Sequence, residues 1–218
     1  LFYDSTALVR DIIMAVRPGN FQQNDTLNRY LLFFPRNANA LNDVHSFTGE
    51  EALSQPYRYT IRFTSPNANI PPDAILNQKA EFLLRAPNPE ASWHGQSSWL
   101  PVRQINGTIT AFSRVKSSSD EALYECVLEH ELALLNRNFR SAVYTDVTVP
   151  EVVTQLMKES RYFEGFNIDF DSLRCTYPRR EMIIQWKETD LEFIRRLLAE
   201  VGIWFRLENH STTPTETV

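Results

Sequence analysis

The chain has 218 residues, of which 43% are hydrophobic and 12% aromatic, enough to build one large or two modest cores. Its formal net charge of −5 argues against a nucleic-acid-binding protein, because phosphate contacts need a concentrated basic surface. No apolar stretch reaches the ~20 residues that a membrane-spanning helix needs, so the composition indicates a globular protein.

The start of the chain and its cysteines give two further expectations. The sequence begins at Leu1 with neither a methionine nor a secretory signal pattern, so we expect no leader and interpret the chain as a fragment of a longer protein. Cys126 and Cys175 are too few for the disulfide framework of a small secreted domain. We expect both thiols to be reduced and buried in a core.

The first half of the chain is predicted to be mainly β-structure. Residues 8–16 place apolar side chains at helical spacing and predict one short helix before Pro18. Residues 57–63 then alternate apolar and polar side chains, which is typical of a half-buried strand. Further strands are expected at 30–34, 43–48, 81–85, 102–112 and 123–130. Six or so strands without helices between them indicate a barrel or a sandwich.

The pattern becomes helical after residue 131. A short apolar piece at 132–135 comes first, and Pro150 then marks the start of a helix that is expected to end at Glu159. Proline suits a first helical position, because the N–H that it lacks would have no partner there.

The most orderly pattern lies within residues 181–209. Thr189 and Glu192 have the spacing of a capping box, and Gly202 stands where a left-handed C-terminal cap is expected. The helix between them carries a wide apolar stripe, and each flanking apolar run is interpreted as a strand. We therefore expect a strand-helix-strand unit whose helix packs on a sheet.

No arrangement of residues in the sequence predicts catalysis or metal binding. The stretch 130–134 begins like a metalloprotease helix, but Leu134 stands where the second histidine belongs. Asp169 and Asp171 lack the glycine and the glutamate of a calcium loop. The histidines are scattered, at His45, His94, His130 and His210. We assign no catalytic, cofactor-binding or metal-ligating residue and expect no cofactor.

The segment 177–203 has the most specific motif of the chain. It reads YPRRE at 177–181 and QWKETD at 185–190, followed by Phe193, Arg196-Leu197, Glu200 and Gly202-Ile203. This series resembles the signature of VgrG proteins, the spike proteins of type VI secretion, which are related to the baseplate hub and late control D proteins of contractile phage tails. Earlier segments at 47–59, 107–110, 124–136 and 149–153 resemble the same family, in family order.

Some positions depart from the family pattern. Residues 1–25 resemble no part of it, and His130 stands where proline is common. Asn77 stands where the family usually has glycine, a mild change because asparagine tolerates the left-handed backbone conformation. The family continues beyond Val218 into the rest of its hub, an oligosaccharide-binding-like domain and a triple-stranded β-helix needle, so we expect the piercing part to be missing here.

The resemblance implies an α+β, mainly β fold: a tail-hub-like β-barrel module with an α+β portion. We expect an N-terminal extension with a short helix at 1–26 and a β-barrel domain at 27–135. Residues 136–218 are expected to form an α+β domain and the start of a second, incomplete barrel. The capped helix 189–202 is expected to brace strands of a barrel.

The resemblance also implies a structural, non-enzymatic role. A homotrimeric ring would act as the hub of a spike, cap a hexameric Hcp-like tube, contact baseplate proteins and help to deliver effectors or adaptors through the missing C-terminal region. Such a bacterial protein would assemble in the cytoplasm at the cell envelope and be secreted through the machine. The assembly would pierce a target membrane, although this chain has no transmembrane segment.

Three alternatives stay open at this point. A phage-tail hub or late control protein would share fold and symmetry but attach to a phage tube. A spike-associated cell-wall hydrolase would use a pair of the plentiful carboxylates. A monomeric adaptor or carbohydrate-binding barrel is suggested by the tryptophans, each of which we nevertheless expect in a core or an interface: Trp93, Trp99, Trp186 and Trp204.

Overall fold

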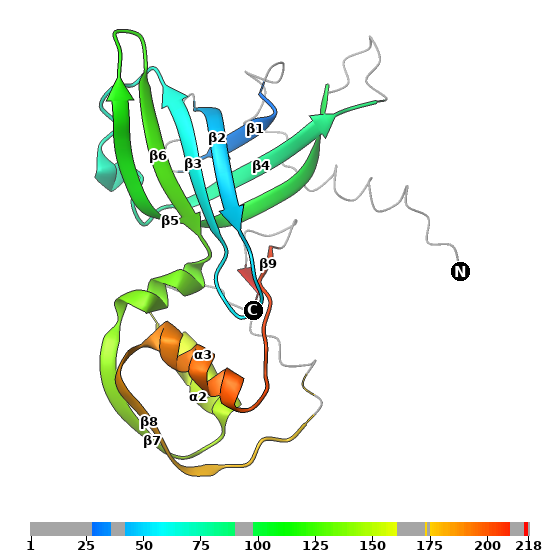
Figure 1. Cartoon of the computed structure of the whole chain (residues 1–218), viewed down its shortest axis with the longest axis vertical. Helices are drawn as coiled ribbons and strands as arrows, with labels where there is room; N and C mark the ends of the chain where they lie inside the picture. The colour runs from blue at the N-terminus through cyan, green and yellow to red at the C-terminus, as the bar shows by residue number, and fades with distance from the viewer. Residues whose placement is uncertain are drawn as a thin grey trace. The chain divides into compact units, whose positions relative to one another are not determined.

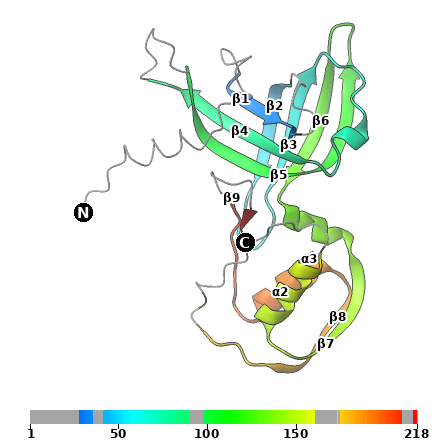
Figure 2. The same cartoon turned by 180° about the vertical axis from the view of Figure 1, so that it is seen from behind.

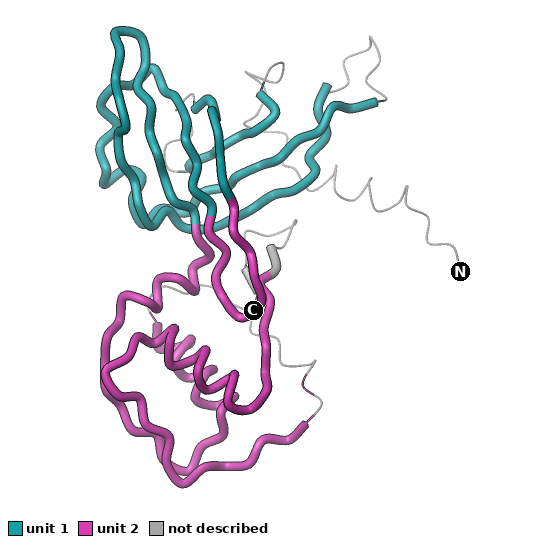
Figure 3. The backbone as a smooth tube through the Cα atoms, in the orientation of Figure 1, with its two compact units in different colours: residues 1–48, 59–128, 209–214 teal, residues 49–58, 129–208, 215–218 magenta. Residues whose placement is uncertain are grey.

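The computed structural model describes residues 28–35, 42–89, 98–160, 173, 175–209 and 216–217. The chain divides into two compact units (Figure 3). Unit 1 contains residues 1–48, 59–128 and 209–214, and unit 2 contains residues 49–58, 129–208 and 215–218. The helix expected at 8–16 and the aspartates of 169–171 lie outside the described residues. The domain boundary expected after residue 135 stays a prediction.

Unit 1 is built around a closed six-stranded barrel (Figure 1) with the strand order β1-β2-β3-β6-β5-β4. The short 3-10 helix η2 (Pro72–Ala74) lies between the third and fourth strands along the chain. The six strands are β1 (Tyr30–Phe33), β2 (Asp43–Glu50), β3 (Arg58–Ser65), β4 (Lys79–Pro87), β5 (Trp99–Ser117) and β6 (Ala122–Glu129). The barrel predicted from the strand pattern is therefore confirmed.

Alternation along the strands fills the barrel. On β3 the side chains of Tyr59, Ile61 and Phe63 are at most 4% exposed, while the residues between them are half-buried or exposed. Phe63 stacks on Tyr124 of β6 with a ring-centroid distance of 5.6 Å. On the outer surface Arg62 pairs with the Glu125 carboxylate at 2.7 Å. The period of two thus separates an aromatic interior from a charged exterior.

Asn77 occupies a tight turn before β4. Its φ is 58°, in the left-handed region, and its N–H donates to the Ile109 carbonyl oxygen at 2.8 Å. Asparagine adopts this conformation more readily than most residues, which explains how it stands in for the glycine expected there.

Unit 2 packs two helices on one face of a two-stranded antiparallel sheet (Figures 1 and 2). Its core includes Val152, Leu156, Ile183, Ile194 and Leu197, drawn from both helices and one strand. A further two-stranded pair is formed by β9 (Glu208–Asn209) and β10 (Glu216–Thr217). The helices and longer strands of unit 2 are η3 (Glu131–Arg137), β7 (Phe139–Val147), α2 (Val149–Glu159), β8 (Arg180–Thr189) and α3 (Asp190–Glu200).

Both α-helices begin with a complete capping box. In α3 the Glu192 N–H donates to Thr189 Oγ1 at 3.2 Å, and the Thr189 N–H donates to Glu192 Oε2 at 2.9 Å, as predicted. In α2 the equivalent pair is Thr148 and Glu151, which the sequence analysis did not single out. Gly202 has a φ of 73° after α3, which confirms the predicted left-handed cap. Among the described segments, no helix has the length and apolar character needed to cross a membrane.

Two expectations for unit 2 were wrong. Residues 203–207 form no strand; a backbone hydrogen bond of 2.9 Å from the Ser54 N–H to the Phe205 carbonyl oxygen makes one bridge rather than a ladder. Helix α3 packs on β8, η3 and α2 rather than on barrel strands. The sheet on which α3 packs consists of β8 and β7, and β7 was not predicted from the sequence.

Candidate assembly surface

The described residues contain no arrangement suited to metal catalysis. Within them, no group of three or more His, Cys, Asp and Glu side chains is placed to hold a metal ion. His45 is exposed on β2, while His94 and His210 lie outside the described residues. Glu50 and Glu51 are both exposed where β2 ends.

His130 is a structural core residue. It is 0% exposed, and its Nδ1 accepts a hydrogen bond of 3.0 Å from the Leu132 N–H at the start of η3. Burial lowers its pKa to about 3, so the ring is neutral at physiological pH. Its φ of −58° is one that proline also adopts, which explains how the two residues alternate at this position.

A buried polar cluster joins the sheet of unit 2 to α3. Asp190 is 3% exposed, and its Oδ1 accepts from Arg140 Nε at 2.7 Å and from Gln185 Nε2 at 2.9 Å. Its Oδ2 accepts from Asn138 Nδ2 at 3.3 Å. Fixed donors from β7, β8 and the end of η3 thus surround one carboxylate. We interpret this cluster as a structural hydrogen-bond network that determines which face of the sheet packs on the helices.

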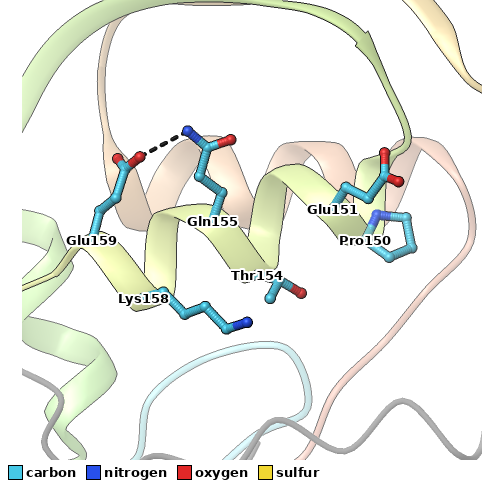
Figure 4. Close-up of a pocket in the computed structure, with 6 residues that line it drawn as sticks. All are labelled: Pro150, Glu151, Thr154, Gln155, Lys158 and Glu159. Atoms are coloured by element: carbon cyan, nitrogen blue, oxygen red, sulfur yellow. Dashed lines mark hydrogen bonds between the residues drawn. The ribbon is translucent and has the colours of Figure 1, made fainter.

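A shallow hollow on the outer side of α2 offers no catalytic geometry (Figure 4). Within it, Gln155 Nε2 donates to Glu159 Oε1 at 2.7 Å, a surface pair one helical turn apart. The hollow is lined by Pro150, Glu151, Thr154, Gln155, Lys158 and Glu159. None of these side chains is buried, so the hollow is part of a solvated helix face.

The unusual surface of unit 2 is the side of the β7–β8 sheet that faces away from the helices, which we call the outer face. Large apolar side chains are exposed on it: Phe139 (68%), Val143 (60%), Met182 (57%), Ile184 (44%) and Trp186 (68%). Clustered exposed apolar side chains of this size mark interaction sites in soluble proteins.

Strand register places these side chains together. Val143 pairs directly with Ile184, and Met182 and Trp186 follow two residues to either side on β8. A register shift between Arg140 and Ala142 marks a β-bulge, and within it Lys187 has a φ of 48°. Such bulges re-aim side chains next to functional surfaces. The opposite face is covered, because Ile183 packs in the helical core.

The tryptophans and cysteines correct the sequence-based expectations in part. Trp99 is half-buried, Trp93 lies outside the described residues, and Trp186 and Trp204 are 68% and 62% exposed in this chain, so neither is a core residue. Cys126 is buried, and burial together with the Glu125 charge raises its thiol pKa to about 12. Cys175 is also free but exposed, so its predicted burial was wrong.

The family model for the phage tail baseplate hub (GPD) matches residues 50–217, most of the chain. The chain belongs to this baseplate hub family.

Individual relatives of this hub chain are bacterial VgrG proteins. The type VI secretion system spike protein VgrG5 of Pseudomonas aeruginosa is 32% identical over 170 residues, which cover 76% of this chain and 19% of the relative. The actin cross-linking toxin VgrG1 of Vibrio cholerae is 27% identical over 73% of this chain and 14% of its own length. The hub chain therefore spans about a fifth or less of these relatives.

One solved structure is similar to the hub chain in both fold and sequence. The E. coli c3393 protein superposes with a TM-score of 0.69 and 36% identity, covering 86% of this chain and 47% of that one. It is a component of the type VI secretion system with structural similarity to the bacteriophage T4 tail proteins gp27 and gp5. The VgrG resemblance of the sequence and its tail-hub-like fold are confirmed.

Proposed function

We propose that this chain is the N-terminal hub part of a type VI secretion spike. The observation that carries the proposal is the likeness to the c3393 protein, a type VI secretion component that is 36% identical to this chain, and the baseplate hub match over residues 50–217 supports it. The chain would form a homotrimeric ring, cap a hexameric Hcp-like tube and act in effector delivery without catalysing a reaction itself.

The proposed assembly places the protein in a bacterial cell. It would assemble in the cytoplasm at the cell envelope, contact baseplate proteins there, and leave through the contractile machine. Effectors or adaptors would be carried by regions outside this chain. Closed barrels suit such a role, because a barrel leaves no exposed strand edge to pair with the wrong neighbour.

Tube binding tests this proposal. The purified chain is mixed with Hcp hexamers from the bacterium that encodes it, and the mass of the complex is measured by light scattering after size-exclusion chromatography. We expect one trimer of the chain for each hexamer, with bovine serum albumin in place of Hcp as the control. Failure to bind Hcp at micromolar concentrations would contradict the proposal.

A phage-tail hub is the second candidate, because the matching family is the phage tail baseplate hub. A phage hub would bind a phage tail-tube protein in the same assay and would leave Hcp free. Turnover of purified peptidoglycan by the chain would instead favour the hydrolase alternative.

A further inference from the structure

We propose that Arg196 protects the open edge of β8, the edge that faces away from β7, from pairing with a strand of another chain. The guanidinium of Arg196 occupies a backbone carbonyl at this edge that an incoming strand would need. The inference does not depend on the proposed function, because every contact that it uses lies within unit 2.

The open edge of β8 is a place where unwanted association is expected. Within the residues that the structure describes, the sheet has two strands, so β8 pairs with β7 on one side only. The unpaired N–H and C=O groups of such an edge form a template for a strand from another chain. Met182, Ile184 and Trp186 of β8 are also large, apolar and exposed, which increases the tendency to associate.

Arg196 reaches the open edge from α3. Its Nη2 donates to the Ile184 carbonyl oxygen at 2.9 Å and to Glu188 Oε1 at 2.6 Å, and its Nε donates to Glu188 Oε2 at 3.1 Å. Successive residues of an antiparallel strand direct their N–H and C=O groups alternately towards the partner strand and away from it. Because the Ile184 carbonyl binds a side chain of α3, we assign Ile184 to the residues that are directed away from β7.

Ion pairs extend this protection along the strand. Glu200 of α3 accepts from Arg196 Nη1 at 2.8 Å and from Arg180 Nη1 at 2.7 Å. Arg180 is the first residue of β8, and Glu188 lies one residue before its end. The charged side chains therefore follow β8 almost from end to end. Charges placed in this way oppose strand pairing, because an incoming strand would have to remove them from water.

A simpler role for Arg196 would be to attach α3 to the sheet. Its side chain is 42% exposed, and exposed ion pairs contribute little to stability. Ile194 and Leu197 already hold α3 in place, because both are fully buried in the core of unit 2. We therefore assign Arg196 to the protection of the edge rather than to the stability of the fold.

Arg196→Gln tests this role in the full chain. Glutamine Nε2 stands where arginine Nε stands, so it keeps the contact with Glu188 but is too short for the Ile184 carbonyl, and glutamine is a good helix former. We expect this variant to self-associate beyond the parent, with an association constant at least about tenfold higher in light scattering over a concentration series. Arg195→Gln makes the same change at an exposed neighbour on α3 and should behave as the parent.

A second variant separates an unprotected edge from a loosened helix. Ile184→Lys, added to Arg196→Gln, places a charge on the edge strand itself, at a position that is 44% exposed, and should restore the mass of the parent. Hydrogen exchange of the peptide 182–186, measured by mass spectrometry, should slow when Arg196→Gln associates, because the N–H groups of the edge become paired.

The inference would be overturned if Arg196→Gln kept the mass of the parent at every concentration. Association that persists after Ile184→Lys, or that leaves exchange at 182–186 unchanged, would also overturn it, because each result indicates contacts away from the β8 edge. Loss of the helical circular dichroism signal in Arg196→Gln would show instead that Arg196 is needed for the fold, which contradicts the assigned role.

Discussion

His130 is held neutral in the folded protein because burial lowers its pKa to about 3. An unfolded histidine has a pKa near 6.5, so below that pH the unfolded chain binds a proton that the folded chain refuses. The stability linked to His130 is therefore fully present above pH 6.5 and is lost as pH falls from 6.5 towards 3.

His130→Asn isolates this contribution, because asparagine also accepts a hydrogen bond at a helix start. Between pH 6 and pH 4 the free energy of unfolding of the parent should fall more steeply than that of the variant, by about 1.4 kcal/mol per pH unit. Urea unfolding at several pH values measures both slopes. Parallel profiles would show that His130 titrates normally in the folded state.

Thr189→Ala removes the side chain that caps α3. Its hydroxyl accepts from the Glu192 N–H, and loss of such a cap costs about 1 kcal/mol of unfolding free energy. Thr189→Ser keeps the hydroxyl and serves as the control in thermal and urea unfolding. Equal stability of the two variants would show that the Thr189 hydroxyl does not stabilise α3.

Single positions were predictable where the cause is local. Thr189 and Gly202 follow from capping chemistry, and the left-handed turn at Asn77 was expected from the glycine of the family. Cys175 was misjudged because burial of a cysteine depends on segments far away in sequence. The exposed Trp186 and Trp204 could not be placed for the same reason.

At the scale of elements, the strands of the barrel were predictable because their alternation is regular. Strand β7 was not predictable, because some of its apolar side chains are exposed and one of its charged side chains points towards the core. Phe139 and Val143 face outward, while Arg140 faces inward and binds Asp190. A polar residue that points to the core hides the period-two signal. The exposure of the outer face could not be predicted, because a nearly continuous apolar run such as that of β8 is typical of a strand buried on both faces.

Helix α3 is the element that should depend most on packing. Leu197 is 0% exposed in the core of unit 2, so Leu197→Ala should lower the free energy of unfolding by about 2 to 5 kcal/mol. Arg195→Ala changes an exposed residue of the same helix and should stay within about 0.5 kcal/mol of the parent. Urea unfolding of both variants checks the prediction. A small effect at Leu197 would contradict the assigned core.

At the scale of the whole molecule, the barrel and the family both support a hub. The family was predictable from a long ordered motif at 177–203. Surfaces that would join subunits in the proposed hub were not predictable, because interface and core strands share the same alternation. The chain spans about half of the c3393 structure, 47% of its length.

The most direct test of the trimeric hub is the absolute mass of the purified chain by light scattering across a concentration series. We expect a concentration-stable species of about 76 kDa, three copies of the 25.3 kDa chain, with a ring-shaped projection in negative stain. A species that stays at 25.3 kDa at every concentration would contradict trimer formation by this chain.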